Sequence, residues 1–108
     1  MNSATRRRLE SRGWKVGNAA DLLDLTPEEE RLVELRLALC HAVKARRRNK
    51  RIPQEALAGM LKTSQSRIAK MEACDPHVST DMMLNAFFAL GAKLSDAGRV
   101  IGDAARNK

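Results

Sequence analysis

Aromatic residues are scarce in this chain of 108 residues, which has no tyrosine, one tryptophan and two phenylalanines. Proteins that read RNA or single-stranded DNA commonly stack the bases on exposed aromatic side chains. A chain this poor in aromatics is therefore a weak candidate for that class. Duplex DNA, which is read from its grooves, is the better candidate among nucleic acids.

Long apolar runs are also absent. No window approaches the run of about 18 apolar residues that a membrane-spanning helix needs. The N-terminus opens with polar and basic residues, without the apolar stretch of a signal peptide. We therefore expect a cytoplasmic protein that does not bind a membrane.

Only two cysteines are present, Cys40 and Cys74, and their separation matches neither a disulfide framework nor a zinc finger. We expect reduced thiols with structural roles, and Cys40 in the core. His41 and His77 add further metal-ligand types, but successive residues of a helix point about 100° apart, so Cys40 and His41 are not expected to share one ion. We predict no metal and no cofactor.

Catalytic patterns are missing as well. The chain has no Ser/His/Asp set, no glycine-rich phosphate loop and no carboxylate pair in a plausible cleft, so we predict that it is not an enzyme. Its length allows one compact domain with a modest extension.

Basic residues, in contrast, are plentiful: 20 Lys and Arg against 13 Asp and Glu give a formal net charge of +7. This charge is segregated, with +4 over residues 1–16, −5 over residues 17–35 and +7 over residues 36–51. A strongly basic segment is typical of proteins that bind a polyanion such as DNA. The acidic segment either binds a second, basic partner or only provides the negative charge that favours a helix N-terminus.

Capping residues and hydrophobic periodicity predict an all-α fold. Thr26 as N-cap, Pro27 at the first position and Glu29 closing a capping box predict a helix that runs to about Arg48. Its apolar residues recur three and four positions apart, and we expect them to face the core: Leu32, Leu35, Leu39, Ala42 and Val43. Further helices are predicted over residues 18–25, 53–61, 65–72, 82–90 and from 95 onward.

The segment from Gln54 to Glu72, QEALAGMLKTSQSRIAKME, carries the motif with most functional content. Its spacing predicts two short helices packed at a steep angle, with apolar side chains filling the corner between them. Such a unit presents its second helix as a ridge that fits the major groove of B-DNA.

This segment strongly resembles the helix-turn-helix of the Cro/CI-like (XRE) repressor family, and the resemblance covers about residues 36–91. It implies a five-helix, lambda-repressor-like domain over residues 31–104, after an N-terminal helical extension over residues 1–30. The longer pattern, with PEE before the motif and DPHVSTD and ALG after it, is similar to XRE-type antitoxins of the HigA kind. For that group the resemblance implies a homodimer on a palindromic operator, and often a RelE/HigB-type toxin as partner.

The resemblance also implies roles for single residues. Gln54 corresponds to a residue that bonds a phosphate, Ser64 and Arg67 to residues that hold the DNA backbone, and three residues to readers of base edges: Gln65, Ser66 and Lys70. In the basic segment, Lys44 and Arg47 are expected to contact phosphates.

Lys62 departs from the family pattern, which commonly has glycine at this turn position. A left-handed conformation there costs a non-glycine residue about 1–2 kcal/mol, so either the turn differs or the strain is tolerated. The Lys62 side chain is also a candidate phosphate contact.

Partner-binding residues are expected in the extension, where Trp14 needs a surface to pack against, either on the domain itself or on a partner. The predicted partner-binding residues are Trp14, Asp21, Asp24 and Glu28. The final helix, with Leu94, Ala97, Val100 and Ile101, is the predicted dimer surface.

The sequence thus predicts a sequence-specific repressor that binds double-stranded DNA, most simply an antitoxin that represses its own operon. Two alternatives stay open. One is a protein-interaction module whose main role is to neutralise the toxin, and the other is a phage or restriction-control regulator without a toxin.

Overall fold

The computed structural model describes residues 24–106 of the chain. Over these residues the fold is all-α, as predicted, with five helices and no strand: α3 (Pro27–Asn49), α4 (Gln54–Met60), α5 (Gln65–Glu72), α6 (Thr80–Ala89) and α7 (Leu94–Arg106). None of these helices is both long and apolar enough to cross a membrane. The helix predicted over residues 18–25 lies almost entirely outside the described residues, and residues 24 and 25 are not helical.

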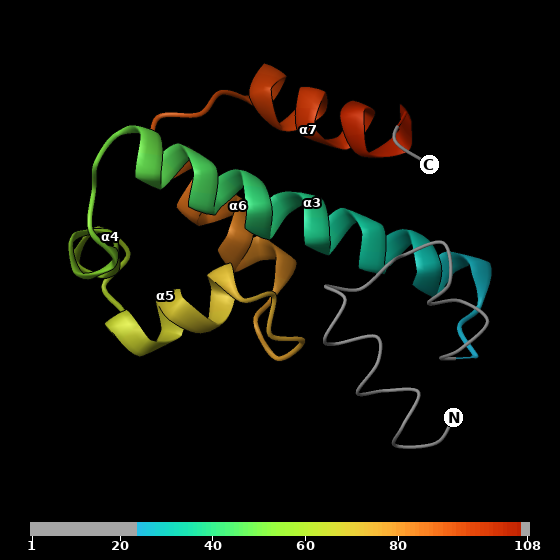
Figure 1. Cartoon of the computed structure of the whole chain (residues 1–108), viewed down its shortest axis with the longest axis horizontal. Coiled ribbons are helices and arrows are strands. Elements are labelled where there is room, and N and C mark those ends of the chain that lie inside the picture. Colours follow the sequence, from blue (N-terminus) through green and yellow to red (C-terminus); the bar gives the residue numbers. More distant parts are fainter. Residues whose placement is uncertain (1–23, 107–108) are drawn as a thin grey trace.

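The long helix α3 organises the described part of the chain (Figure 1). Helices α5, α6 and α7 all pack against α3, and α4 packs against α5. In Figure 1, α7 follows α3 on one side, whereas α4 and α5 lie on the other side, toward the C-terminal end of α3. The domain boundary expected after residue 30 falls inside α3, so residues 28–30 belong to this helix.

The helix starts follow from local capping, as the sequence indicates. The Thr26 side chain accepts a hydrogen bond from the Glu29 N–H (3.1 Å), and the Thr26 N–H donates to the Glu29 carboxylate (3.0 Å). Ser64 and Ser79 cap α5 and α6 in a similar way, because each accepts from the backbone N–H three residues later. These bonds satisfy donors that a helix leaves unpaired at its first turn.

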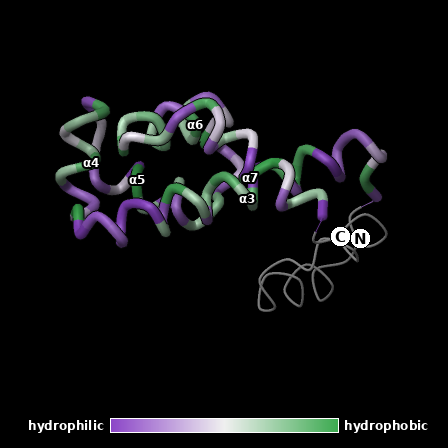
Figure 2. The backbone as a smooth tube through the Cα atoms, turned by 90° about the horizontal axis from the view of Figure 1, so that it is seen from above, coloured by the Kyte–Doolittle hydropathy of each residue, from purple (hydrophilic) through white to green (hydrophobic). Residues whose placement is uncertain are grey.

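The core is formed where the apolar faces of these helices meet. Figure 2 shows hydrophobic and hydrophilic residues mixed along the helices. The largest fully buried side chains come from all parts of the described chain except α7: Leu39, Cys40, Val43, Leu57, Ile68, Met71, Val78, Met83 and Leu90. Leu32, expected in the core stripe, is 55% exposed, because that stripe meets the other helices only from Leu35 onward.

The turn between α4 and α5 shows which of the two alternatives holds at Lys62, a different turn or a tolerated strain. Its φ is 55°, so Lys62 adopts the left-handed conformation, and the strain is tolerated. The turn is held by a bond from the Thr63 N–H to the Ala58 carbonyl (2.9 Å) and one from the Lys62 N–H to the Gly59 carbonyl (3.2 Å). The turn therefore has the geometry that glycine would favour, without glycine.

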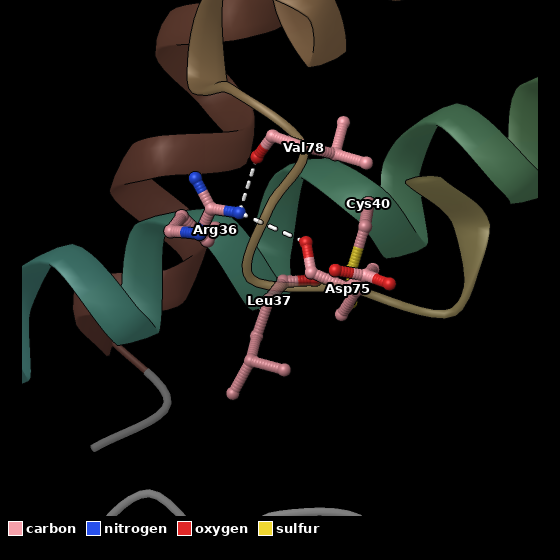
Figure 3. Close-up of a disulfide and its surroundings, with 6 residues drawn as sticks. Arg36, Leu37, Cys40, Asp75 and Val78 are labelled. Atoms are coloured by element: carbon pink, nitrogen blue, oxygen red, sulfur yellow. Dashed lines mark hydrogen bonds between the residues drawn. A yellow bond between two sulfur atoms is a disulfide. The ribbon is translucent and has the colours of Figure 1, made fainter. Parts of the chain in front are cut away.

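The two cysteines are joined in a disulfide, so the expectation of reduced thiols is wrong (Figure 3). Their separation of 34 residues gave no sign of this pairing, because the contact arises only when the end of α5 packs against the middle of α3. Cys40 is fully buried, as expected for a core residue. By the chain-entropy argument, closing a loop of this length stabilises the fold by about 3–4 kcal/mol.

Replacing Lys62 with Gly is expected to give a protein about 1 kcal/mol more stable than Lys62→Ala. Both substitutions remove the charge, but only glycine adopts the left-handed backbone without a steric cost. Urea unfolding of the two variants measures the difference. A Lys62→Gly variant less stable than Lys62→Ala would contradict the left-handed turn.

Candidate nucleic-acid interface

Helices α4 and α5 form a compact pair whose buried faces meet at a corner. Leu57 and Ala58 of α4 and Ile68 and Met71 of α5 are all buried, with exposed fractions of 4% or less. Apolar residues are concentrated on this side of α5, so its opposite side is polar. The corner expected from the sequence is therefore present.

The outward side of α5 and the turn before it gather six of the nine residues predicted to contact DNA. We call this the α5 surface, and it consists of Lys62, Ser64, Gln65, Ser66, Arg67 and Lys70. All six residues are exposed. The Ser64 oxygen already accepts the Arg67 N–H at 3.2 Å, so its hydroxyl proton is the group that remains to donate outward.

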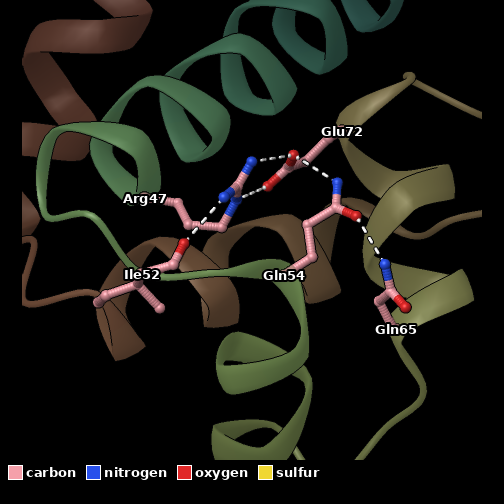
Figure 4. Close-up of polar contacts among 5 residues, drawn as sticks. All are labelled: Arg47, Ile52, Gln54, Gln65 and Glu72. Carbon is pink, nitrogen blue, oxygen red and sulfur yellow. Dashed lines mark hydrogen bonds and ion pairs between the residues drawn. The ribbon is translucent and has the colours of Figure 1, made fainter.

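The α5 surface is attached to α3 through a buried ion pair between Arg47 and Glu72 (Figure 4). The guanidinium donates to both carboxylate oxygens, at 2.5 and 2.9 Å, and also to the Ile52 carbonyl at 2.8 Å. The two side chains are 12% and 3% exposed. This corrects the expected role of Arg47, because its charged group is bound inside the protein and does not face a phosphate.

Gln54 extends this network to the surface. Its amide nitrogen donates to Glu72 at 3.0 Å, and its amide oxygen accepts from the Gln65 side chain at 3.3 Å. Figure 4 shows these contacts running from α3 across the start of α4 to the first turn of α5. Gln54 therefore orients Gln65, and its own phosphate contact stays a prediction.

The pKa values of the pair reflect the same contacts. Burial by itself raises the pKa of Glu72, but hydrogen bonds from Arg47 and Gln54 and the positive charge of Arg47 outweigh it, so the net shift is downward. The hydrogen bond to Glu72 raises the pKa of Arg47. Both groups are therefore held in their charged forms.

Lys44 is exposed on α3, three residues before Arg47 and so on a neighbouring part of the same helix face, and its charge also lowers the pKa of Glu72. A phosphate contact by Lys44 is compatible with this position.

The predicted partner-binding residues are not part of this surface. Asp24 and Glu28 are exposed beside the start of α3, which lies at the opposite end of the molecule from α4 (Figure 1). Glu29, in the same acidic run, closes the capping box, so at least this acid serves the helix start. Trp14 and Asp21 lie outside the described residues.

Two features of the site were not predicted from the sequence. Glu72 was noted only as the last residue of the motif, although it is one of two acids within residues 36–74, the other being Glu55. The structure also brings together Cys40, His41 and Cys74, with potential ligand atoms within 4.8 Å of one another, although helix geometry argued against the first two sharing a site. With both sulfurs in the disulfide, this group presents no thiolate.

Comparisons with protein-family models, with curated proteins and with solved structures give no match for this chain. Its functional assignment therefore rests on its own residues and geometry.

Replacing Glu72 with Gln is expected to lower the free energy of unfolding at pH 7 by about 3 kcal/mol, because Arg47 then stays buried without its counter-charge. The pKa of Glu72 is lowered by folding, so its charge stabilises the fold fully above the ordinary glutamate value of about 4.3. This contribution is lost as the pH falls through the folded pKa. The difference between the two proteins should therefore shrink in acid, which urea unfolding from neutral pH to about pH 3 measures.

Glu55, exposed in the first turn of α4, provides the matched control. Glu55→Gln removes the same charge from an exposed site and should change stability by less than about 1 kcal/mol. Equal losses for the two variants would contradict a special role for the buried pair.

Proposed function

We propose that α4 and α5 form a helix-turn-helix of the Cro/CI-like (XRE) type and that the chain is a transcriptional repressor that binds double-stranded DNA sequence-specifically. The observation that carries the proposal is the hydrogen-bonded path from the buried Arg47–Glu72 pair through Gln54 to Gln65. It supports the proposal because a side chain that reads a base edge must be held in one orientation before DNA arrives.

The chemistry of the α5 surface agrees with this function. Gln65 offers an amide, the group that pairs with the adenine edge through two hydrogen bonds. Ser66 and Lys70 add a hydroxyl and an ammonium group on the same helix, and Arg67 and Lys62 supply charges for the flanking phosphates. Lys44 extends the basic surface onto α3.

A repressor of this kind binds a palindrome as a homodimer, so that two copies of α5 enter major grooves roughly 10 bp apart. Helix α7 supports self-association because Leu94 is 81% and Ile101 48% exposed. Ala97 is buried and Val100 packs against the core, so only half of the expected dimer face is available.

An antitoxin role is the more specific form of this proposal. It is supported by the separation of charge, since the exposed Asp24 and Glu28 lie far from the basic α5 surface. Such a molecule can bind DNA and a basic protein at the same time without the two competing for one surface.

Gln65→Ala is expected to relax base preference at one step of the operator, with a loss of about 1–3 kcal/mol of discrimination. The operator is first selected from a random duplex library, and binding is then titrated on it and on single-step variants. Failure of the full chain to enrich any sequence would contradict the proposed function.

Two charge variants control for non-specific binding. Lys44→Ala should weaken binding to all DNA sequences alike. It should also lower the slope of log affinity against log salt concentration by about one unit. Lys93→Ala removes the same charge from the segment between α6 and α7, which lies across α3 from α5 in Figure 1, and should leave affinity unchanged. If both lysines have the same effect, net charge and not the α5 surface controls binding.

Deleting residues 1–23 tests the antitoxin role while keeping the capping box of α3. The full chain and the shortened chain are each mixed with the product of any adjacent gene that encodes a small basic protein. We expect both to bind the operator, and we expect the shortened chain, which keeps Asp24 and Glu28 but lacks Trp14 and Asp21, to bind that protein more weakly than the full chain. No complex with the full chain would favour a regulator without a toxin.

A further inference from the structure

The end of α5 carries a cysteine at a position that usually holds glycine. After the C-cap Ala73, the N–H of Cys74 donates to the Met71 carbonyl and the N–H of Asp75 to the Lys70 carbonyl, each at 3.0 Å. This pair of bonds defines a Schellman motif, and Cys74, with a φ of 60°, occupies its left-handed residue. Arg51 and Lys62 adopt the same left-handed conformation, so Cys74 differs from them in its covalent partner and not in its backbone.

That covalent partner is Cys40. Cys40 contributes its sulfur from the middle of α3, and the two Cα atoms are 5.8 Å apart, within the ordinary range for a disulfide. One turn earlier on α3, Arg36 donates to the Asp75 carbonyl at 3.1 Å and to the Val78 carbonyl (Figure 3). The segment after α5 is therefore attached to α3 by a covalent bond and by a guanidinium group.

The two cysteines differ in burial. Cys40 is fully buried, whereas Cys74 is only partly buried and lines a cavity of about 110 Å³. Arg36 lines the same cavity, and its positive charge favours the approach of an anionic thiolate. A thiol reagent therefore meets Cys74 first.

We propose that the Cys40–Cys74 disulfide is a redox-controlled tether that holds the C-terminal end of α5 against α3, and that its reduction weakens DNA binding. This inference rests on the proposed function of the α5 surface. Helix α5 has eight residues, fewer than a helix needs to be stable alone, so its orientation depends on its attachments. Its first turn is attached through Gln54, and its end through both Glu72 and Cys74.

Reduction takes place by thiol–disulfide exchange with a low-molecular-weight dithiol. One thiolate of the dithiol attacks the Cys74 sulfur, the bond between the two protein sulfurs breaks, and Cys40 leaves as a thiolate that takes up a proton. The second thiol of the reagent then attacks the mixed disulfide, closes the reagent's own disulfide and releases Cys74 as a thiol. The protein gains two electrons and two protons, and the dithiol loses them.

The test compares the oxidised full chain with the same chain treated with dithiothreitol, with the thiols counted by titration. Zero thiols before treatment and two after it establish the two states. If the released end of α5 adopts the binding arrangement about one tenth of the time, operator affinity falls about tenfold on reduction. Equal affinity in two states verified by the thiol count would overturn the tether.

Cys74→Gly separates the tether from the strain of the turn. Glycine relaxes the left-handed residue but removes the covalent link. We expect this variant to bind the operator like the reduced wild type and to be insensitive to dithiothreitol. Binding as tight as that of the oxidised wild type would show that the tether is not needed. Cys74→Ala, which lacks the link but keeps the Cβ, should behave like Cys74→Gly.

Hydrogen exchange of the α5 amides distinguishes a failure of this inference from a failure of the proposed function. If no duplex is bound in either state, the proposed function fails, and the tether is still judged by exchange. Faster exchange across the second half of α5 after reduction supports the tether. Equal exchange in the two states overturns it, whether or not the protein binds DNA.

Discussion

Neither Arg47 nor Glu72 is stable in the interior of this protein without the other, because transfer of an isolated charge out of water costs several kcal/mol. The pair therefore constrains the fold. Helices α3 and α5 must approach until the guanidinium and the carboxylate meet, and the Ile52 carbonyl must lie beside them to accept the remaining donor. Apolar packing brings the helices together, but it tolerates small rotations that this bidentate contact does not.

The buried ion pair is connected to the α5 surface through the side-chain amide of Gln54. Gln54 bonds Glu72 on one side and Gln65 on the other, so the orientation of an exposed side chain depends on a buried charge. The α5 surface thus owes its chemistry to residues 62–70 and its geometry to α3. For a surface proposed to read DNA, this means that a substitution in the buried Arg47–Glu72 pair affects DNA affinity although neither residue contacts the DNA.

The sequence predicted features that depend on neighbouring residues. The start of α3 was predicted because its cap and the partner of that cap lie three residues apart, and the bounds of α5 and the apolar corner between α4 and α5 follow from helical periodicity. Helix α6 begins at Thr80, two residues before the predicted start. Pairings of distant residues were not foreseen. Arg47 and Glu72 are 25 positions apart and the cysteines 34, and in both cases the chain passes through the connections from α3 to α4 and from α4 to α5, whose directions periodicity does not give. The sequence therefore predicts a phosphate contact for Arg47 and reduced, unpaired thiols, whereas the structure pairs both within the protein.

Both unforeseen pairings end at the same place, the C-terminal end of α5, where Glu72 and Cys74 follow one another with a single residue between them. The ion pair is reversible and sensitive to acid, whereas the disulfide is covalent and sensitive to thiols, so the two attachments respond to different conditions. With either one intact, the buried Ile68 and Met71 still hold α5 in the core. Loss of one attachment therefore affects the orientation of α5 first and the folding of α5 only later. Binding by the α5 surface can then be regulated without unfolding of the protein.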